Sequence, residues 1–582
     1  MTEYVPTAFE KSLIELTSPD PWNQIVVLSC KTINEGFSRL YDAAKAKDPM
    51  STPLCHIDLK PRTITATMVA NLKPSQVIAN VVEKAGDKVP MLYFQWNFES
   101  GTMSVPLEYE EEGTKDYDLQ GWRVAFATKI VSEPVSTEDE RYGEIKKRMG
   151  DPVGDFSISR LFLQVQGFRS DQVGYYAPGS YFGGINWDKE PAAPHTAFNV
   201  LLDVWASKMK KGWHDTVGFR LVTSKPETVQ PHAPTFPPTS ITYTTYPWID
   251  PTTPRDKDNG SSANALCYLI MTKNRAPSTA TPLLPYTGTW VTADKLIDPG
   301  RDAIMCISAP QFWGEWLLPQ MRALNLAAHV QPLEPTLEAD GFNGASIQLD
   351  FEAGRCTAHP ESSDAYFAFK PGKDGEDEEG KWNSKWEWKS NDELCRTRNH
   401  MKNHEMKWTL NQDAWARTSV AFAKGGNTIT ISGEVGVHAM VNATLALTSW
   451  GTAEMTGTQP FSITYRLCGI DSGVESGGLQ VVRDPGTRFP DPIIKTSGPS
   501  GAVRIDNWED FCQKTTDNVA SSIIQKLGLV DGALLRDLKG VNRFFLPGAG
   551  VFNFARPMFN KRGDMVTNLS YTGWVFPFLS CY

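Results

Sequence analysis

Apolar residues recur at helical spacing in four stretches of the chain. Within each stretch they follow one another at steps of three and four, which places them on one face of a helix. The stretches cover residues 21–45, 196–209, 308–330 and 506–527. Each begins at a residue that caps helices well, namely Asp20, Thr196, Ser308 or Asp506. Gly528 is the expected end of the last helix, and Pro319 should kink or shift the third.

Between these helices, apolar and polar residues alternate with a period of two. Such alternation is typical of strands that bury one face. It covers residues 63–69, 89–96, 122–127, 240–246, 427–437 and 461–467. A charged stretch, residues 137–147, is expected to be an exposed helix or loop. A few helices separated by many strands indicate an α+β protein with antiparallel sheets, not an alternating βαβ fold.

Composition and charge narrow the class of protein. The 582 residues are long enough for roughly three to five domains, and 41% hydrophobic residues exclude global disorder. Aromatic residues at 11%, with 45 Gly and 40 Pro, are typical of a chain rich in strands and turns. A net charge of −10 argues against nucleic-acid binding, which needs a basic surface.

The chain carries no recognisable membrane span or export signal. No run of 18 apolar residues occurs, and residues 1–18 lack the apolar core of a signal peptide. The nine cysteines are scattered and form no CxxC pair, as expected of reduced thiols. We therefore expect a soluble cytoplasmic protein without a transmembrane segment, and peripheral contact with a membrane stays open. Release by a non-classical route stays open.

Motifs for catalysis or cofactor binding are weak. Residues 375–381 have the GxxxxGK spacing of a phosphate loop, but Trp382 replaces the Ser or Thr that would bind Mg²⁺. Four consecutive carboxylates inside that loop would also repel a triphosphate. His400 and His404 lack a third metal ligand, and residues 498–501 are expected to form a turn without a nucleophile. We expect no enzyme activity, no metal and no cofactor.

Several short segments resemble one protein family in the same order along the chain. The opening segment is PWNQIVVLSCKTIN, residues 21–34. The others are residues 154–158 (GDFSI), 161–163, 234–240 (PTFPPTS), 307–312, 316–319 (WLLP), 545–548 (FLPG) and 557–560. Together they resemble the clostridial P-forty-seven family, whose members accompany some botulinum neurotoxin clusters alongside the orfX products.

The resemblance implies a fold of the tubular lipid-binding (TULIP-like) superfamily. In such an elongated fold, strongly curved antiparallel sheets wrap long amphipathic helices and leave an apolar groove or tunnel. The implied organisation is an N-terminal extension (1–20), a first TULIP-like half (21–300) and a second half (301–582), although the halves could interleave. Within the second half, the Trp-rich residues 355–415 match the family worst and are a candidate insertion.

The function that the resemblance implies is binding of a lipid or another hydrophobic ligand. Apolar side chains on the predicted helices are the candidates to line the groove, namely Val26, Ile33, Phe37, Trp316, Leu317, Val519 and Ile523. Protein partners in a toxin-related complex are also implied. The alternative is a structural or interaction subunit whose packed interior holds no ligand.

Overall fold

The structure, a computed structural model, describes most of the chain. The described residues are 21–79, 92–107, 113–148, 156–165, 175–223, 236, 238–249, 262–276, 284, 288–291, 303–329, 333–340, 346–355, 367–369, 382, 384–389, 395–401, 406–446, 448–469, 479–484, 489–537, 545–546 and 550–571.

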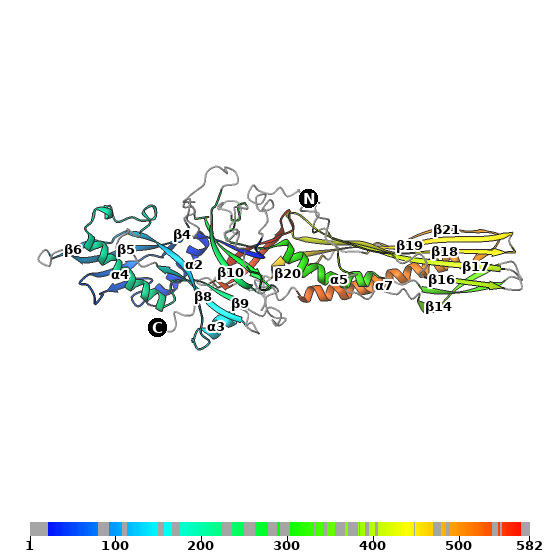
Figure 1. Cartoon of the computed structure of the whole chain (residues 1–582), viewed down its shortest axis with the longest axis horizontal. Coiled ribbons are helices and arrows are strands. Elements are labelled where there is room, and N and C mark those ends of the chain that lie inside the picture. The colour runs from blue at the N-terminus through cyan, green and yellow to red at the C-terminus, as the bar shows by residue number, and fades with distance from the viewer. Residues whose placement is uncertain are drawn as a thin grey trace.

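The molecule is elongated, with one sheet at each end and a third between them (Figure 1). The sheet at the first end has, in its described part, eight antiparallel strands. They are β2 (His56–Leu59), β3 (Thr67–Leu72), β4 (Gln76–Ala79), β5 (Leu92–Pro106), β6 (Thr114–Asp118), β7 (Arg123–Pro134), β8 (Phe156–Val165) and β9 (Thr216–Thr223). The helical segments of this end are α2 (Cys30–Lys47), α3 (Tyr142–Arg148), η2 (Ala177–Gly179), η3 (Trp187–Lys189) and α4 (Ala192–Lys211).

The middle sheet takes its strands from distant parts of the sequence. Its order is β10 (Pro238–Tyr246), β11 (Ala265–Thr272), β1 (Gln24–Ser29), β12 (Ala303–Ile307), β25 (Met565–Tyr571), β24 (Gly550–Phe559) and β23 (Phe545–Leu546). Strand β1 therefore lies between strands that follow it by more than 200 residues, and the C-terminal strands β24 and β25 complete the same sheet. Ile25 and Val27 face one apolar cluster while Val26 and Leu28 face another, so both sides of β1 are buried.

The second end is built from long antiparallel strands. Three of them, of 17, 18 and 21 residues, form the centre of the sheet. The strands are β15 (Ser384–Lys389), β16 (Cys395–Met401), β17 (Met406–Phe422), β18 (Thr428–Leu445), β19 (Ser449–Gly469), β20 (Leu479–Arg483) and β21 (Ile493–Gly501). Helices α5 (Leu318–Ala328) and α7 (Trp508–Asp537) pack on each other and run along this sheet (Figure 1).

A small three-stranded sheet lies next to α7 at the second end. Strands β13 (Leu333–Asp340) and β14 (Ser346–Arg355) are antiparallel, and β22 (Arg504–Asp506) pairs with β14 in parallel just before α7 begins. Apart from this short pair, the described ladders are antiparallel. The predicted α+β class with antiparallel sheets is confirmed.

The first predicted helix is wrong over its opening third. Residues 24–29 form strand β1, and α2 begins at Cys30, where the Ser29 side chain accepts a hydrogen bond from the Thr32 N–H at 3.1 Å. Asp20, the predicted cap, lies outside the described residues. The run Ile25–Leu28 contains three β-branched residues, which favour strands, and it is covered on both faces. In the sequence, the apolar residues of β1 have the spacing of the apolar face of α2. In the structure, they are part of a strand and not of the helix.

The other helices are confirmed with shifted boundaries. Helix α4 begins four residues before Thr196, whose hydroxyl donates back to the Ala192 carbonyl at 3.0 Å and does not cap. Residues 310–317 (η5) form a π-helical segment that leads into α5, and Pro319 lies in the first turn of α5, so the expected shift at this proline is present. Helix α7 continues through Gly528 to Asp537. A glycine in a helix interior costs only about 1 kcal/mol relative to alanine, so it does not by itself end a helix.

The predicted strands overlap β3, β5, β7, β10, β18 and β19. The charged stretch 137–147 contains α3. Within the Trp-rich stretch 355–415, residues 384–389, 395–401 and 406–415 form β15, β16 and the first half of β17, and these strands pair within the long sheet. The predicted turn at residues 498–501 is wrong, because these residues close strand β21.

Candidate functional site

The seven candidate groove residues are all buried. Six of them lie on helical segments: Ile33 and Phe37 on α2, Trp316 and Leu317 on η5, and Val519 and Ile523 on α7. Val26 was expected on the first helix but lies on strand β1. None of the seven exposes more than 8% of its surface. They therefore belong to the interior, as residues that touch an apolar ligand must.

One continuous apolar cluster contains all seven candidates. It extends from the packing of α2 on the first sheet, through the middle sheet, to the packing of α7 on the long sheet. These regions follow one another along the long axis of the molecule (Figure 1). The structure thus connects residues that the sequence separates by almost 500 positions.

At the first end, aromatic rings form the wall beside α2 and α4. Phe37 of α2 meets Phe94 of β5 edge to face, with ring centres 5.7 Å apart. Trp205 of α4 stacks on Trp96 of β5 at 4.4 Å and lies 5.8 Å from Phe94. Rings that interlock in these geometries contribute about 0.5–1.5 kcal/mol per pair beyond their buried area. Together they fix the positions of both helices on the sheet.

In the middle, the aromatic face of η5 packs against residues in and beside the middle sheet. Trp316 lies with its ring centre 6.5 Å from Phe236, and Phe312 lies 5.4 Å from Phe559 of β24. The Trp313 indole donates a hydrogen bond to the Gly563 carbonyl at 2.7 Å. The contacts of Phe312 and Trp313 join η5 to residues about 250 positions later in the chain.

At the second end, α7 approaches the sheet closely. The inner face of β17 to β19 carries small residues, among them Ala414, Ala439 and Gly457. A Cβ atom added at Gly457 would lie 2.2 Å from the Thr516 hydroxyl oxygen of α7. At this position the helix and the sheet leave no room for a ligand. Val519 and Ile523 lie one and two turns further along the same buried face of α7.

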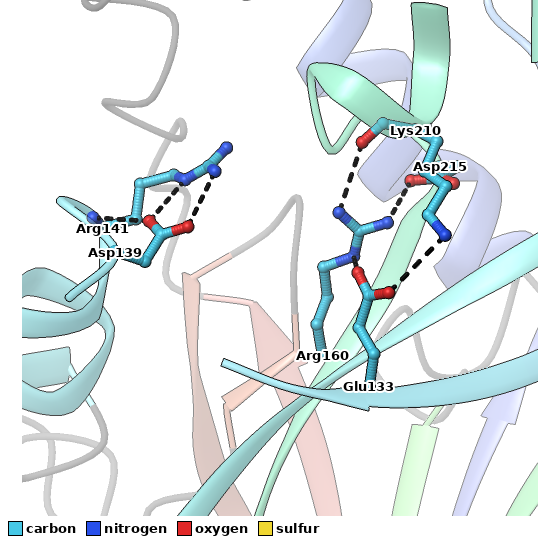
Figure 2. A network of polar contacts seen from close by, with 6 residues as sticks. All are labelled: Glu133, Asp139, Arg141, Arg160, Lys210 and Asp215. Atoms are coloured by element: carbon cyan, nitrogen blue, oxygen red, sulfur yellow. Dashed lines mark hydrogen bonds and ion pairs between the residues drawn. The ribbon is translucent and has the colours of Figure 1, made fainter. Parts of the chain in front are cut away.

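A polar network that sequence reasoning missed borders the first end of this interior (Figure 2). Arg160 of β8 is only 1% exposed, and its guanidinium contacts the Asp215 carboxylate at 3.1 Å and lies 3.4 Å from Glu133. It also donates to the Lys210 carbonyl at 3.4 Å, while the Lys210 ammonium lies 3.6 Å from Glu133. Arg160 thus ties β7 and β8 to the end of α4. No local motif could reveal it, because its partners are 27 to 55 residues away.

A tryptophan next to this network lies between two arginines. The Arg141 guanidinium lies 3.6 Å from the ring centre of Trp213 and that of Arg160 lies at 4.8 Å. Arg141 itself forms a two-point ion pair with Asp139, with both distances 2.9 Å (Figure 2). Hydrogen bonding to Arg141 holds the pKa of the Asp139 carboxyl below its usual range.

Burial is the main cause of the shifted pKa values of two neighbouring groups, Asp215 and His214. It raises the pKa of Asp215 to about 6, although the Arg160 charge acts in the opposite direction. It lowers the pKa of the His214 imidazole to about 4. Burial also raises the pKa of the Cys30 thiol to about 12 and that of Cys55 to about 11, so both thiols stay protonated at neutral pH. Both cysteines are buried in the apolar cluster.

The weak motifs do not assemble a reaction centre in the part of the chain that is described. His400 lies on strand β16, so the helical spacing to His404 does not apply, and His404 and the loop 373–381 lie outside the described residues. Among described residues, no group of three His, Cys, Asp or Glu side chains could hold a metal ion. No described helix is long and apolar enough to cross a membrane.

Comparisons with known proteins return solved structures only. No family model and no curated protein sequence matches the chain. The P47 structure from Clostridium botulinum A2 matches 94% of this chain and 97% of its own length at 8% identity and a TM-score of 0.37. The P47 structure of Clostridium botulinum E1 matches 95% and 99% at 10% identity and a TM-score of 0.38.

A third solved structure, a lipopolysaccharide binding protein, matches 94% of this chain and 99% of its own length at 10% identity and a TM-score of 0.29. The first two structures carry the name of the family that the sequence segments resemble.

Proposed function

We propose that this protein binds a lipid or another apolar molecule in its interior and catalyses no reaction. The observation that carries the proposal is the single apolar cluster that runs through the length of the molecule and includes every candidate residue. An acyl chain needs a long apolar channel because each buried methylene contributes about 0.8 kcal/mol. The motifs shared with the P-forty-seven family, and the TULIP-like fold they imply, support the same function.

At one point of its second end, the cluster is packed too closely to hold a ligand. Close contact between Thr516 and Gly457 favours a fully packed interior at that point of α7. A ligand would therefore lie beside Ile33 and Phe37 of α2, or beyond Thr516 at Val519 and Ile523. The alternative function, a packed interaction subunit that serves a protein complex or a membrane surface, predicts that neither place takes up lipid.

Mass spectrometry under native conditions, with lipid extraction, tests the proposal directly. Purified protein should carry co-purified acyl chains, and delipidated protein should take up a fluorescent fatty acid. Ile33→Trp tests the position beside α2, and Ile523→Trp tests the position beside α7. The variant whose position holds the ligand should take up less lipid, with little change in its melting temperature. Ile524→Trp is the matched control, because Ile524 is the next residue of α7 and is 40% exposed.

The packed alternative gives a different result. Both variants would then lose about 1–3 kcal/mol of folding free energy through overpacking. Lipid uptake would be absent in the parent protein or unchanged in both variants. Absent uptake in the parent protein, or unchanged uptake in both variants, would contradict the proposed lipid binding if no lipid can be extracted from the purified protein.

A further inference from the structure

A polar cavity opens at the first end of the molecule, and Phe98 is the one lining residue that belongs to the apolar cluster. Its volume is about 500 Å³, and α2, β5, the start of β7 and the β3–β4 connection line it. The lining includes two cations, Lys73 and Arg123, and no carboxylate. In a chain with a net charge of −10, a cavity lined by cations alone indicates a negatively charged ligand.

The walls of the cavity are held in place by side-chain amides. Asn34 of α2 donates to the Val77 carbonyl at 3.1 Å and accepts from the Val77 N–H at 2.6 Å. Gln95 of β5 donates to the Gly179 carbonyl at 2.7 Å, and Asn97 donates to the Pro74 carbonyl at 2.8 Å. Each bond joins one wall to another element, so the cavity is formed before any ligand arrives. Preformed walls reduce the ordering cost of binding.

The two cations are available at the mouth of the cavity. The side chains of Lys73 and Arg123 are exposed, and neither has a carboxylate partner among the described residues. The backbone of Arg123 is fixed by two hydrogen bonds with Tyr181, at 2.7 and 2.8 Å, and its guanidinium lies 5.8 Å from the Tyr181 ring centre. Arginine and lysine side chains bind phosphate and carboxylate oxygens through charge-assisted hydrogen bonds.

One buried acceptor remains without a partner. Asn97 is 7% exposed, and its Oδ1 atom accepts no hydrogen bond, although its amide nitrogen is bonded to Pro74. An unpaired buried oxygen is unfavourable. This atom exposes almost no surface, so a ligand hydroxyl would reach it only if the Asn97 side chain turned towards the cavity. The hydroxyl-bearing Ser38 and Ser75 line the same cavity. Simple inorganic anions would use the cations and leave these neutral groups unused.

We propose that this cavity binds a hydroxylated organic anion, with the chemistry of a sugar phosphate or a sugar acid. Its anionic group would contact Lys73 and Arg123, and its hydroxyl groups would reach Ser38 and Ser75 in the lining. Such a group occurs in free metabolites and in the headgroups of some lipids. Apart from Phe98, the lining contains no residue of the apolar cluster, so the site does not depend on the proposed function.

Titration calorimetry with glucose 1-phosphate tests the site. We expect binding that is at least about tenfold tighter than that of inorganic phosphate or of glucose alone, because only the combined ligand uses both halves of the cavity. Arg123→Gln should weaken binding by about tenfold or more and leave the fold intact, since its hydrogen bonds to Tyr181 come from the backbone. Lys495→Gln makes the same charge change on the exposed strand β21 at the other end of the molecule and should leave affinity unchanged.

A second arm separates the two sources of the ligand. Vesicles of phosphatidylcholine with phosphatidylglycerol, whose headgroup is a hydroxylated phosphate, are compared with phosphatidylcholine alone in a sedimentation assay. Binding to the mixed vesicles that Arg123→Gln abolishes would assign the site to a headgroup. The proposal is overturned if neither glucose 1-phosphate nor the mixed vesicles bind, if inorganic phosphate binds as tightly, or if Arg123→Gln changes nothing.

Discussion

At the scale of single residues, the buried guanidinium of Arg160 contacts Glu133, Asp215 and the Lys210 carbonyl. Its charge is compensated by Asp215 and Glu133, which come from two other elements. Taking such charges out of water is costly, and the ion pair offsets this cost only while both partners are present. The network therefore affects stability most when one member is removed.

Arg160→Met should lower the free energy of unfolding by about 3–5 kcal/mol, because it leaves Asp215 buried without its cation. The loss should be smaller at pH 5 than at pH 8, since Asp215, whose pKa is about 6, becomes neutral in acid. The double variant with Asp215→Asn should recover part of the loss. Urea unfolding measures the free energy of unfolding of the parent protein, of Arg160→Met and of the double variant at both pH values. Arg417→Met, whose exposed pair with Glu434 spans 3.2 Å, is the control and should cost less than about 1 kcal/mol.

His214 should make the protein sensitive to acid. Its pKa is about 4 in the folded state and about 6.5 when unfolded, so the unfolded chain binds more protons between these values. The contribution of His214 to the free energy of unfolding therefore rises between pH 4 and pH 6.5, by about 3 kcal/mol at most. His214→Gln should flatten the dependence of stability on pH in that window.

The neighbouring carboxyl provides a control of opposite sign. Asp215 has a raised pKa in the folded state, so its own contribution falls as pH rises from about 4 to about 6. Asp215→Asn should therefore steepen the rise that His214 produces. Equal slopes in the parent and both variants would show that neither group controls acid stability.

At the scale of elements, the packing of α7 depends on small residues in the sheet beneath it. Thr516 contacts β19 at Gly457, and its hydroxyl donates to the Cys512 carbonyl at 2.8 Å within the helix. A methyl group at residue 457 would displace the helix from the sheet. The glycine is thus required by the approach of the helix and not by the conformation of the strand.

Gly457→Ala should lower stability by about 1–3 kcal/mol through overpacking, measured by thermal or urea unfolding. Gly143→Ala is the matched control. It lies in α3, where an added Cβ meets no atom within 4 Å, so it should be neutral or slightly stabilising. Equal stability of both variants would mean that α7 does not contact the sheet as described.

At the scale of the whole molecule, the middle sheet joins both ends of the chain. Strand β12 lies between β1 and β25, and all five of its residues are buried. Asp564, just before β25, accepts a hydrogen bond from the Ala309 N–H at 2.7 Å, which places the start of η5. The C-terminal strands are therefore part of the core of the molecule.

A chain that ends at residue 549 should fail to fold as a soluble monomer. Removing β24 and β25 turns β12 into an exposed apolar edge, and such edges promote aggregation. Size-exclusion chromatography and circular dichroism would show this. A chain that ends at Tyr571 keeps both strands and is the control. A soluble shorter chain with the parent spectrum would contradict the role of the middle sheet.

The sequence alone determined the type of those helices and strands that bury one face and expose the other. Helices α4, α5 and α7 and the long strands β18 and β19 each bury one face, so the period of their apolar residues reveals their type. Six of the seven candidate residues lie on helical segments that the same periods predicted, whereas Val26 lies on strand β1. Strand β1 was missed because both of its faces are covered, which removes the alternation.

Only the tertiary structure decided which residues meet. Arg160 and Asp215 are 55 positions apart, and the cavity at Asn97 is assembled from α2, β5, β7 and the β3–β4 connection. Pairing over such distances depends on the order of strands in a sheet, which no local period encodes. The continuous apolar cluster arises in the same way, because β1, β12 and β25 bring the two ends of the chain into one sheet.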